Sequence, residues 1–217
     1  MLIITAAGNS TRFENLGTHT PKGLLPIKGK PIIDHLIASI GQERNIIVTT
    51  FDKYDIFRNK YETIPIKSAG SAISDLLQVR NLVKQSFWWS VSDGFPSGKV
   101  NASENTVFVH HVSDPEKYNT VQLKEKSIKA CGGFGRRWKE ITDIRHFVPT
   151  YYQYGLCGLF RIEDPDKFFE ICEKAVNSGL KDREVNNMVF NYMVGFSAQV
   201  IEWNEFNTLE DYLTWKK

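Results

Sequence analysis

The chain opens with Leu2-Ile-Ile-Thr-Ala-Ala-Gly-Asn-Ser-Thr-Arg-Phe13, and Thr20-Pro-Lys-Gly-Leu-Leu-Pro-Ile-Lys-Gly-Lys-Pro-Ile-Ile-Asp-His-Leu36 follows after a polar loop. The apolar run of the first stretch is too short for a buried helix and ends in small residues. It therefore predicts a buried strand followed by a tight turn that exposes backbone N–H groups. Arg12 can hold phosphate oxygens with two parallel hydrogen bonds, and Lys22, beside the stiff Pro21, adds a point charge. The two stretches together indicate a polyphosphate site.

The composition favours a globular chain with a small anionic partner. Of 217 residues, 41% are hydrophobic, which is enough for one substantial core. The formal net charge of +2 is too small to imply a general nucleic-acid or membrane surface. We therefore expect a single domain over residues 1–217, in which the basic residues that matter for function are clustered at one site rather than spread over the surface.

The cysteines and the apolar runs predict a cytoplasmic protein. Cys131, Cys157 and Cys172 are odd in number and form no Cys-x-x-Cys pair, which argues against a disulfide framework or a zinc knuckle. No apolar run approaches the roughly 20 residues that a membrane helix needs, and the N-terminus lacks the pattern of a signal peptide. A membrane partner is not expected.

Short β-branched or apolar runs alternate with helical patterns, which predicts a Rossmann-like sheet with helices packed on it. The predicted helices cover residues 31–40, 52–61, 71–84, 164–177 and 184–194, and Thr208 caps a last one. The predicted strands begin at Leu2 and cover residues 45–51, 63–67, 87–94, 106–112, 151–160 and 196–203, with a hairpin within 114–131. Trp88 and Trp89 are adjacent in a strand, so their side chains should pack on opposite faces of the sheet.

Two further positions suit ligand chemistry. Gly70-Ser71-Ala72 opens a predicted helix, whose N-terminus attracts anions, although Ser71 is equally typical of an ordinary helix cap. Asp93 ends an apolar strand, and ligands of open α/β sheets gather at the carboxyl ends of strands. Its carboxylate suits a hard cation that bridges phosphates, with a simple Asp-Gly turn as the alternative.

The order of these motifs resembles the signature of the sugar-phosphate nucleotidyltransferases, the enzymes that make nucleotide sugars. The resemblance covers nearly the full chain and includes Trp203-Asn-Glu-Phe-Asn-Thr-Leu-Glu-Asp-Tyr212, which is similar to the motif that closes the family's pattern. It implies a Rossmann-like three-layer α/β sandwich with a mixed, mainly parallel central sheet, of the nucleotide-diphospho-sugar transferase type. It also implies a magnesium cofactor and the following roles. Arg12 and Lys22 would be catalytic, Asp93 and Glu205 would bind the metal, and the nucleotide would lie against Ala6, Ala7, Gly8, Asn9, Ser10, Thr11, Gly70, Ser71 and Ala72.

The acceptor side departs from the family pattern. Asp114-Pro-Glu-Lys-Tyr-Asn-Thr-Val121 resembles the family's Asp-Pro-x-x-Tyr-Gly-x-Val hairpin, which implies acceptor contacts from Tyr118 and Asn119. The family then has Glu-Lys-Pro, whereas this chain has Gly132-Gly-Phe-Gly-Arg-Arg-Trp138. Arg136 or Arg137 is a candidate for holding the acceptor phosphate, because guanidinium groups match phosphate geometry. A solvated surface turn is the alternative.

We therefore expect a magnesium-dependent nucleotidyltransferase that transfers a nucleoside monophosphate from a nucleoside triphosphate to a metabolite phosphate and releases pyrophosphate. A sugar 1-phosphate is the first choice of acceptor. Two alternatives stay open: a cytidylyltransferase for a non-sugar phosphate such as phosphocholine, and a degenerate member that binds nucleotide without turnover. The expected partners are the nucleotide and a small phosphorylated metabolite, not nucleic acid, and a homo-oligomer is compatible with the sequence.

Overall fold

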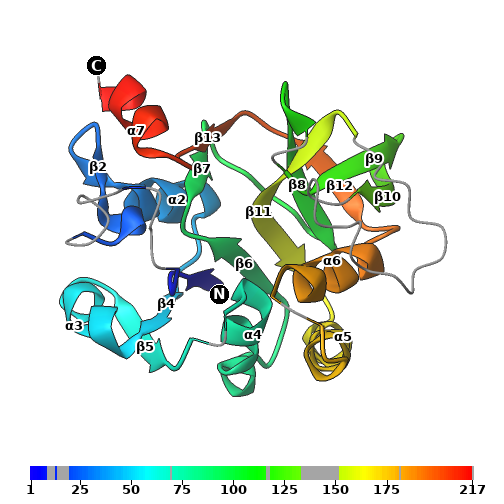
Figure 1. Ribbon diagram of the computed structural model, residues 1–217, viewed down its shortest axis with the longest axis horizontal. Coiled ribbons are helices and arrows are strands. Elements are labelled where there is room, and N and C mark those ends of the chain that lie inside the picture. Colours follow the sequence, from blue (N-terminus) through cyan, green and yellow to red (C-terminus); the bar gives the residue numbers. More distant parts are fainter. Residues whose placement is uncertain are drawn as a thin grey trace.

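The computed structural model of the protein describes residues 1–8, 13, 20–68, 70–115, 118–132, 152–180 and 182–216. Within these ranges, nine strands form one mixed sheet in the order β5-β4-β1-β6-β11-β8-β12-β10-β9, and helices lie on both of its faces (Figure 1). The strands of this sheet are β1 (Leu2–Thr5), β4 (Asn45–Thr50), β5 (Glu62–Ile66), β6 (Phe87–Val91), β8 (Thr106–His111), β9 (Thr120–Lys124), β10 (Ser127–Gly132), β11 (Tyr154–Ile162) and β12 (Ser197–Val200). The predicted α/β sandwich with a mixed central sheet is confirmed.

The first four strands in sequence that belong to this sheet form a continuous parallel block at one end of it. Strand β1 lies between β4 and β6, with Leu2 opposite Asn45 on one side and Trp88 on the other. Strand β11 then pairs antiparallel with β6 and β8, whereas β8 and β12 are parallel. Because β1, β5 and β6 run in the same direction, the segments that follow them leave the sheet at one edge.

The helices divide into two groups that build the two cores of the sandwich. Buried residues of α4, α5 and α6 pack on one face of the sheet, and those of α2, α3 and α7 on the other. Ile3 and Trp89 belong to the first core and Ile4 and Trp88 to the second, as the alternation of strand side chains requires. The helices are α2 (Ile32–Ile40), α3 (Phe51–Arg58), α4 (Ala72–Leu77), α5 (Pro165–Asn177), α6 (Asp182–Tyr192) and α7 (Leu209–Lys216). In the described part of the chain, no helix combines the length and apolar character needed to span a membrane.

Two short strand pairs lie outside the main sheet. Strand β2 (Pro26–Ile27) pairs with β3 (Lys30–Pro31), and β7 (Gly94–Pro96) pairs with β13 (Trp203–Glu205). The prediction of one strand over residues 196–203 was wrong: strand β12 ends at Val200, and the chain from Trp203 onward pairs with β7 instead.

The predicted helix over residues 71–84 is also shorter than expected. Helix α4 ends at Leu77, and a short 3-10 helix (Arg80–Leu82) follows. The Gln78 side chain at this end donates a hydrogen bond to the Lys67 carbonyl, a tertiary contact that the local helical pattern does not contain. Helix length here therefore depends on packing as well as on local sequence.

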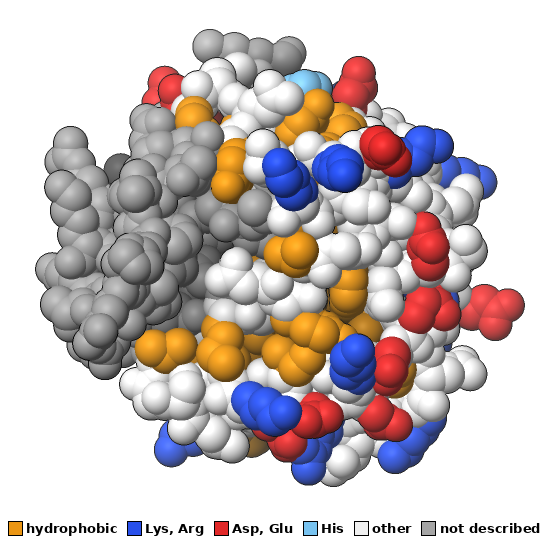
Figure 2. Space-filling view, turned by 90° about the vertical axis from the view of Figure 1, so that its right-hand side faces the viewer, with side chains coloured by type: hydrophobic (Ala, Val, Ile, Leu, Met, Phe, Trp, Pro, Cys, Tyr) orange, Lys and Arg blue, Asp and Glu red, His pale blue; other side chains and the backbone are white. Residues whose placement is uncertain are grey.

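The antiparallel end of the molecule has a mixed surface. On this face, Lys and Arg side chains lie interspersed with Asp and Glu, and hydrophobic side chains lie between them (Figure 2). Exposed apolar side chains in and after α6 and at the end of β12 are Met188, Val194 and Val200. The interspersed charges agree with the small net charge of the sequence.

Candidate active site at the carboxyl ends of the parallel strands

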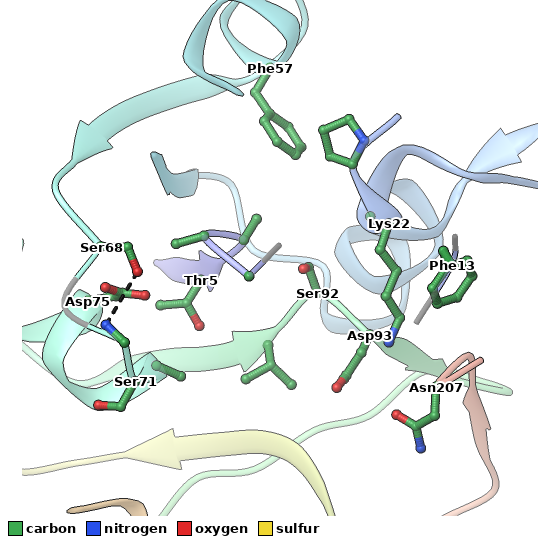
Figure 3. A pocket seen from close by; sticks show the side chains of 18 residues that line it. Thr5, Phe13, Lys22, Phe57, Ser68, Ser71, Asp75, Ser92, Asp93 and Asn207 are labelled. Carbon is green, nitrogen blue, oxygen red and sulfur yellow. Dashed lines mark hydrogen bonds between the residues drawn. The ribbon is translucent and has the colours of Figure 1, made fainter. Parts of the chain in front are cut away.

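A cavity of about 330 Å³ lies at the edge where β1, β5 and β6 end (Figure 3). Segments that are far apart in the sequence form its wall: the turn after β1, the 3-10 helix (Lys22–Leu24), the start of α4 and the end of β6. Eight residues predicted to bind nucleotide, catalyse or bind metal line it, namely Ala6, Ala7, Gly8, Lys22, Gly70, Ser71, Ala72 and Asp93. The fold therefore brings these predicted residues together, while their individual roles stay predictions.

The turn after β1 is held firmly at its start. The Ala6 N–H donates to the Val48 carbonyl over 2.7 Å, and the Thr49 hydroxyl donates to the Ala6 carbonyl over 3.1 Å. Lys53, in the first turn of α3, donates to the Gly8 carbonyl over 2.7 Å, and burial lowers its pKa. The sequence analysis did not identify Lys53. Its signal was its place just after β4, the strand beside β1.

Lys22 reaches the cavity because the next residue has no side chain. A Cβ atom on Gly23 would lie 2.6 Å from Ile33 Cδ1 and 3.3 Å from Ser92 Cβ, so a larger residue would push the segment away from the end of β6. The Lys22 Nζ lies 5.5 Å from the centre of the Phe13 ring, and the side chain extends toward Asp93 (Figure 3). The Lys22 side chain thus brings a cation to the wall of this cavity.

The start of α4 combines a helix cap with a cavity wall. The Ser71 hydroxyl oxygen accepts a hydrogen bond from the Ser74 N–H over 3.0 Å, which confirms the capping interpretation. Gly70 has a φ of 91°, in the region that favours glycine. Asp75 also lines the cavity with only 5% of its surface exposed, and the sequence analysis missed it. An acidic residue among the buried Ile73 and Leu76 was the available signal.

Strand pairing brings the two predicted metal ligands into one place. Strands β7 and β13 are antiparallel with Glu205 opposite Gly94, and the Phe206 N–H donates to the Asp93 carbonyl over 3.0 Å. A Cβ atom on Gly94 would lie 2.5 Å from the Asn204 carbonyl oxygen, so this close pairing requires glycine. Two carboxylates that are far apart in the sequence, Asp93 and Glu205, therefore meet near the carboxyl end of β6.

The electrostatics of this pair suit a cation. Burial and the nearby Asp93 carboxylate raise the pKa of Glu205 to about 7. Hydrogen bonds from Tyr118 and Asn207 and the charge of Lys22 act in the opposite direction. Burial and the Glu205 carboxylate raise the pKa of the Tyr118 hydroxyl in turn. Carboxylate oxygens are the donor type that a hard divalent ion prefers.

The described residues contain no group of three or more His, Cys, Asp or Glu side chains arranged to hold a metal. Asp93 and Glu205 alone are nevertheless compatible with magnesium. This ion keeps several waters and is commonly held by one or two carboxylates together with substrate phosphates. The donor set therefore fits the predicted cofactor.

A second cavity of about 160 Å³ shares Ala72, Val91 and Asp93 with the first. Glu205 and Asn119 line it, and Tyr118 reaches this region through its hydrogen bond to Glu205. Its other walls come from β6, β11 and α6, and they include residues that the sequence analysis did not select: Trp89, Leu156, Cys157, Gly158, Phe160, Asn186 and Phe190. Asp93 thus lies where the two cavities meet.

Six predicted site residues lie outside the described part of the chain. These are Asn9, Ser10, Thr11, Arg12, Arg136 and Arg137. Their predicted roles in nucleotide binding, catalysis and acceptor binding stay predictions.

Comparison with known proteins supports the resemblance seen in the motifs. No family model matches the chain. The bifunctional protein GlmU of Methanococcus maripaludis strain C7 is 30% identical over 132 residues, which cover 56% of this chain and 32% of the relative. The UTP–glucose-1-phosphate uridylyltransferase AglF of Haloferax volcanii is 32% identical over 73 residues, which cover 31% of this chain and 30% of the relative. The chain thus spans about a third of the length of these curated relatives.

Solved structures match almost the whole chain. The CTP:phosphocholine cytidylyltransferase of Streptococcus pneumoniae has a TM-score of 0.77 at 18% identity, covering 99% of this chain and 96% of its own. An apo UDP-glucose pyrophosphorylase has a TM-score of 0.75 at 17% identity, with the same coverage of 99% and 96%. These likenesses agree with the order of the motifs: part of the sequence is similar to sugar-phosphate nucleotidyltransferases, and the chain shares the Rossmann-like α/β fold of the solved structures.

Proposed function

We propose that the protein is a magnesium-dependent nucleotidyltransferase that transfers a nucleoside monophosphate from a nucleoside triphosphate to the phosphate of a small metabolite and releases pyrophosphate. A sugar 1-phosphate is the preferred acceptor. The observation that carries the proposal is the position of Asp93 between two cavities, with Lys22 on one side and Glu205 on the other. Two substrates that react with each other need this arrangement of adjoining sites.

The geometry suggests how the residues of this chain would act. The first cavity would hold the nucleotide, with its triphosphate between the turn after β1 and Lys22. The second would hold the acceptor, so that its phosphate oxygen attacks the α-phosphorus in line and pyrophosphate leaves. The protein performs little covalent chemistry in such a reaction, and catalysis comes from positioning and charge stabilisation. Lys22 would offset the negative charge that the phosphoryl oxygens carry.

Asp93 and Glu205 are the residues that would hold magnesium. A bound ion would withdraw negative charge from phosphate oxygens. Tyr118 and Asn207 donate hydrogen bonds to Glu205 and would fix the direction of its carboxylate. On this proposal the protein serves nucleotide-sugar and polysaccharide biosynthesis in the cytoplasm.

Pyrophosphate release tests the proposal directly. The purified protein would be incubated with UTP, CTP, dTTP, GTP or ATP, each combined with glucose 1-phosphate, N-acetylglucosamine 1-phosphate, inositol 1-phosphate or phosphocholine. We expect release from at least one pair, loss of release on chelation of magnesium, and recovery when magnesium is restored. Nucleotide binding without pyrophosphate from any pair would instead support the alternative of a degenerate member that binds nucleotide without turnover. Release of pyrophosphate only when phosphocholine is the acceptor would reject the sugar 1-phosphate and support the cytidylyltransferase alternative.

A further inference from the structure

Two asparagine side chains border the second cavity, and each carries an oxygen that accepts no hydrogen bond from the described residues. Asn119 lies just before β9, and Asn186 lies on α6. The Oδ1 atoms of both are buried. Buried amide oxygens in native proteins are nearly always paired, so two orphaned ones beside the same cavity call for a physical reason.

Asn186 occupies a position where packing alone would favour an apolar residue. Its neighbours Val185, Val189 and Phe190 are buried in the core beneath α6. Residues four apart lie on the same face of a helix, so Asn186 and Phe190 share a face. A buried amide oxygen without a partner on this face destabilises the fold, and function is a common reason for retaining such a group.

The Asn119 side chain is likewise not needed to hold its own backbone. The Leu156 N–H donates to the Asn119 carbonyl over 2.9 Å, which ties this segment to β11 through main-chain atoms. The side-chain oxygen takes no part in that bond. It is buried and has no hydrogen-bond partner among the described residues.

The chemistry of these oxygens selects a class of ligand. An amide oxygen only accepts hydrogen bonds, so its partner must carry O–H or N–H groups. A trimethylammonium group carries none and binds best over exposed aromatic faces. The cavity's rings instead stack on one another, with centroids 4.8 Å apart for Trp89 and Phe160 and 5.7 Å for Phe160 and Phe190. The described walls thus suit hydroxyl groups better than a quaternary amine.

We propose that Asn119 and Asn186 accept hydrogen bonds from hydroxyl groups of the acceptor, and that Asn186 selects a polyhydroxylated phosphate over one that ends in trimethylammonium. This inference rests on the proposed function, because it takes the second cavity as the acceptor site. It adds a specificity residue on α6 that the motifs of the sequence do not contain.

The kinetic test compares Asn186→Leu with Asn191→Leu, a matched control at an exposed position of the same helix. Leucine has a similar size to asparagine but accepts no hydrogen bond. For the hydroxylated acceptor with the highest activity, Asn186→Leu should raise KM about tenfold, the effect expected from one lost hydrogen bond. The KM for the nucleotide should change less than about twofold, since one lost bond affects only the substrate that makes it. Asn191→Leu should change neither constant.

Thermal stability separates a binding role from a structural one. Asn186→Leu should melt at or above the temperature of the wild type, because it replaces a buried amide oxygen that has no partner among the described residues by an apolar group. A clearly lower melting temperature would show that Asn186 supports the fold, and it would overturn the proposal. Equal changes of the acceptor KM in Asn186→Leu and Asn191→Leu would also overturn it.

A binding measurement keeps the inference testable even if the protein does not turn over. Melting curves would be recorded with a nonhydrolysable nucleotide analogue and glucose 1-phosphate, inositol 1-phosphate or phosphocholine. At least one hydroxylated probe should raise the melting temperature of the wild type more than phosphocholine does, and Asn186→Leu should lose that rise. If only phosphocholine stabilises the protein, or if no hydroxylated probe does, the inference fails. If no pyrophosphate is released but the thermal shifts follow the expected pattern, the proposed activity is rejected and the inference about Asn186 stands.

Discussion

The substitution Gly94→Ala tests whether the pairing of β7 with β13 builds the active site. The added Cβ would lie 2.5 Å from the Asn204 carbonyl oxygen, about 0.9 Å short of the 3.4 Å at which ordinary contact begins. The Trp203 indole, with Nε1 at 2.6 Å, belongs to a side chain, whereas the backbone oxygen can move only if β13 moves. Because Glu205 faces Gly94 in this register, its carboxylate would shift relative to Asp93 by a similar distance.

A displacement of this size should lower turnover strongly. A misplacement of about 1 Å can cost roughly a hundredfold in rate, and overpacking a close contact costs about 1–3 kcal/mol of stability. We therefore expect turnover to fall about a hundredfold and the magnesium concentration for half-maximal activity to rise. The assay is the initial rate of pyrophosphate release over a magnesium titration, with melting curves recorded in parallel.

Gly98→Ala is the matched control for this prediction. A Cβ atom on Gly98 meets nothing within 4 Å, so the same substitution a few residues away should change neither rate nor magnesium dependence. If Gly94→Ala keeps its turnover within about threefold of the wild type with an unchanged magnesium titration, then close pairing of the two strands does not position the site. The reasoning from geometry to activity would then be refuted.

Three further substitutions test other parts of the site. Lys22→Ala should lower turnover at least about a hundredfold with little change in melting temperature, because it removes charge stabilisation. Lys30→Ala, on the exposed surface, should leave turnover unchanged. Near-normal turnover in Lys22→Ala would contradict the assigned role. Asp93→Asn and Glu205→Gln should each abolish the magnesium dependence of activity, since an amide supplies no charge. If either variant responds to magnesium as the wild type does, the substituted residue is not a metal ligand. Ser71→Ala should lower the free energy of unfolding by about 1 kcal/mol through loss of the helix cap, and urea denaturation that shows no change would argue against the cap.

Local features of the fold could be predicted from the sequence because neighbouring residues decide them. The buried strand at Leu2–Thr5 and helix α2 follow from short-range hydrophobic patterns. Ser71 and Thr208 each cap a helix by accepting a hydrogen bond from the N–H three residues later. Such contacts span a few residues, so the sequence shows both partners at once.

The ordered motifs also predicted which residues line the first cavity. Parallel strands separated by helices must end at one edge of a sheet, so Gly8, Gly70 and Asp93 were expected near one another. The structure places all three on the same cavity wall. The rule that parallel strands end at one edge of the sheet thus allows local motifs to predict a long-range contact.

Only the tertiary structure decided how the later segments complete the site. Glu205 pairs with Gly94 because β13 lies outside the main sheet and pairs with β7. No local pattern specifies that strand register. The same holds for Asn186, whose place at the second cavity depends on how α6 packs against α5 and β10. The physical reason is that register and helix rotation are selected by contacts between segments far apart in the chain. The sequence alone determined the chemical groups, and long-range packing determined which of them face each other.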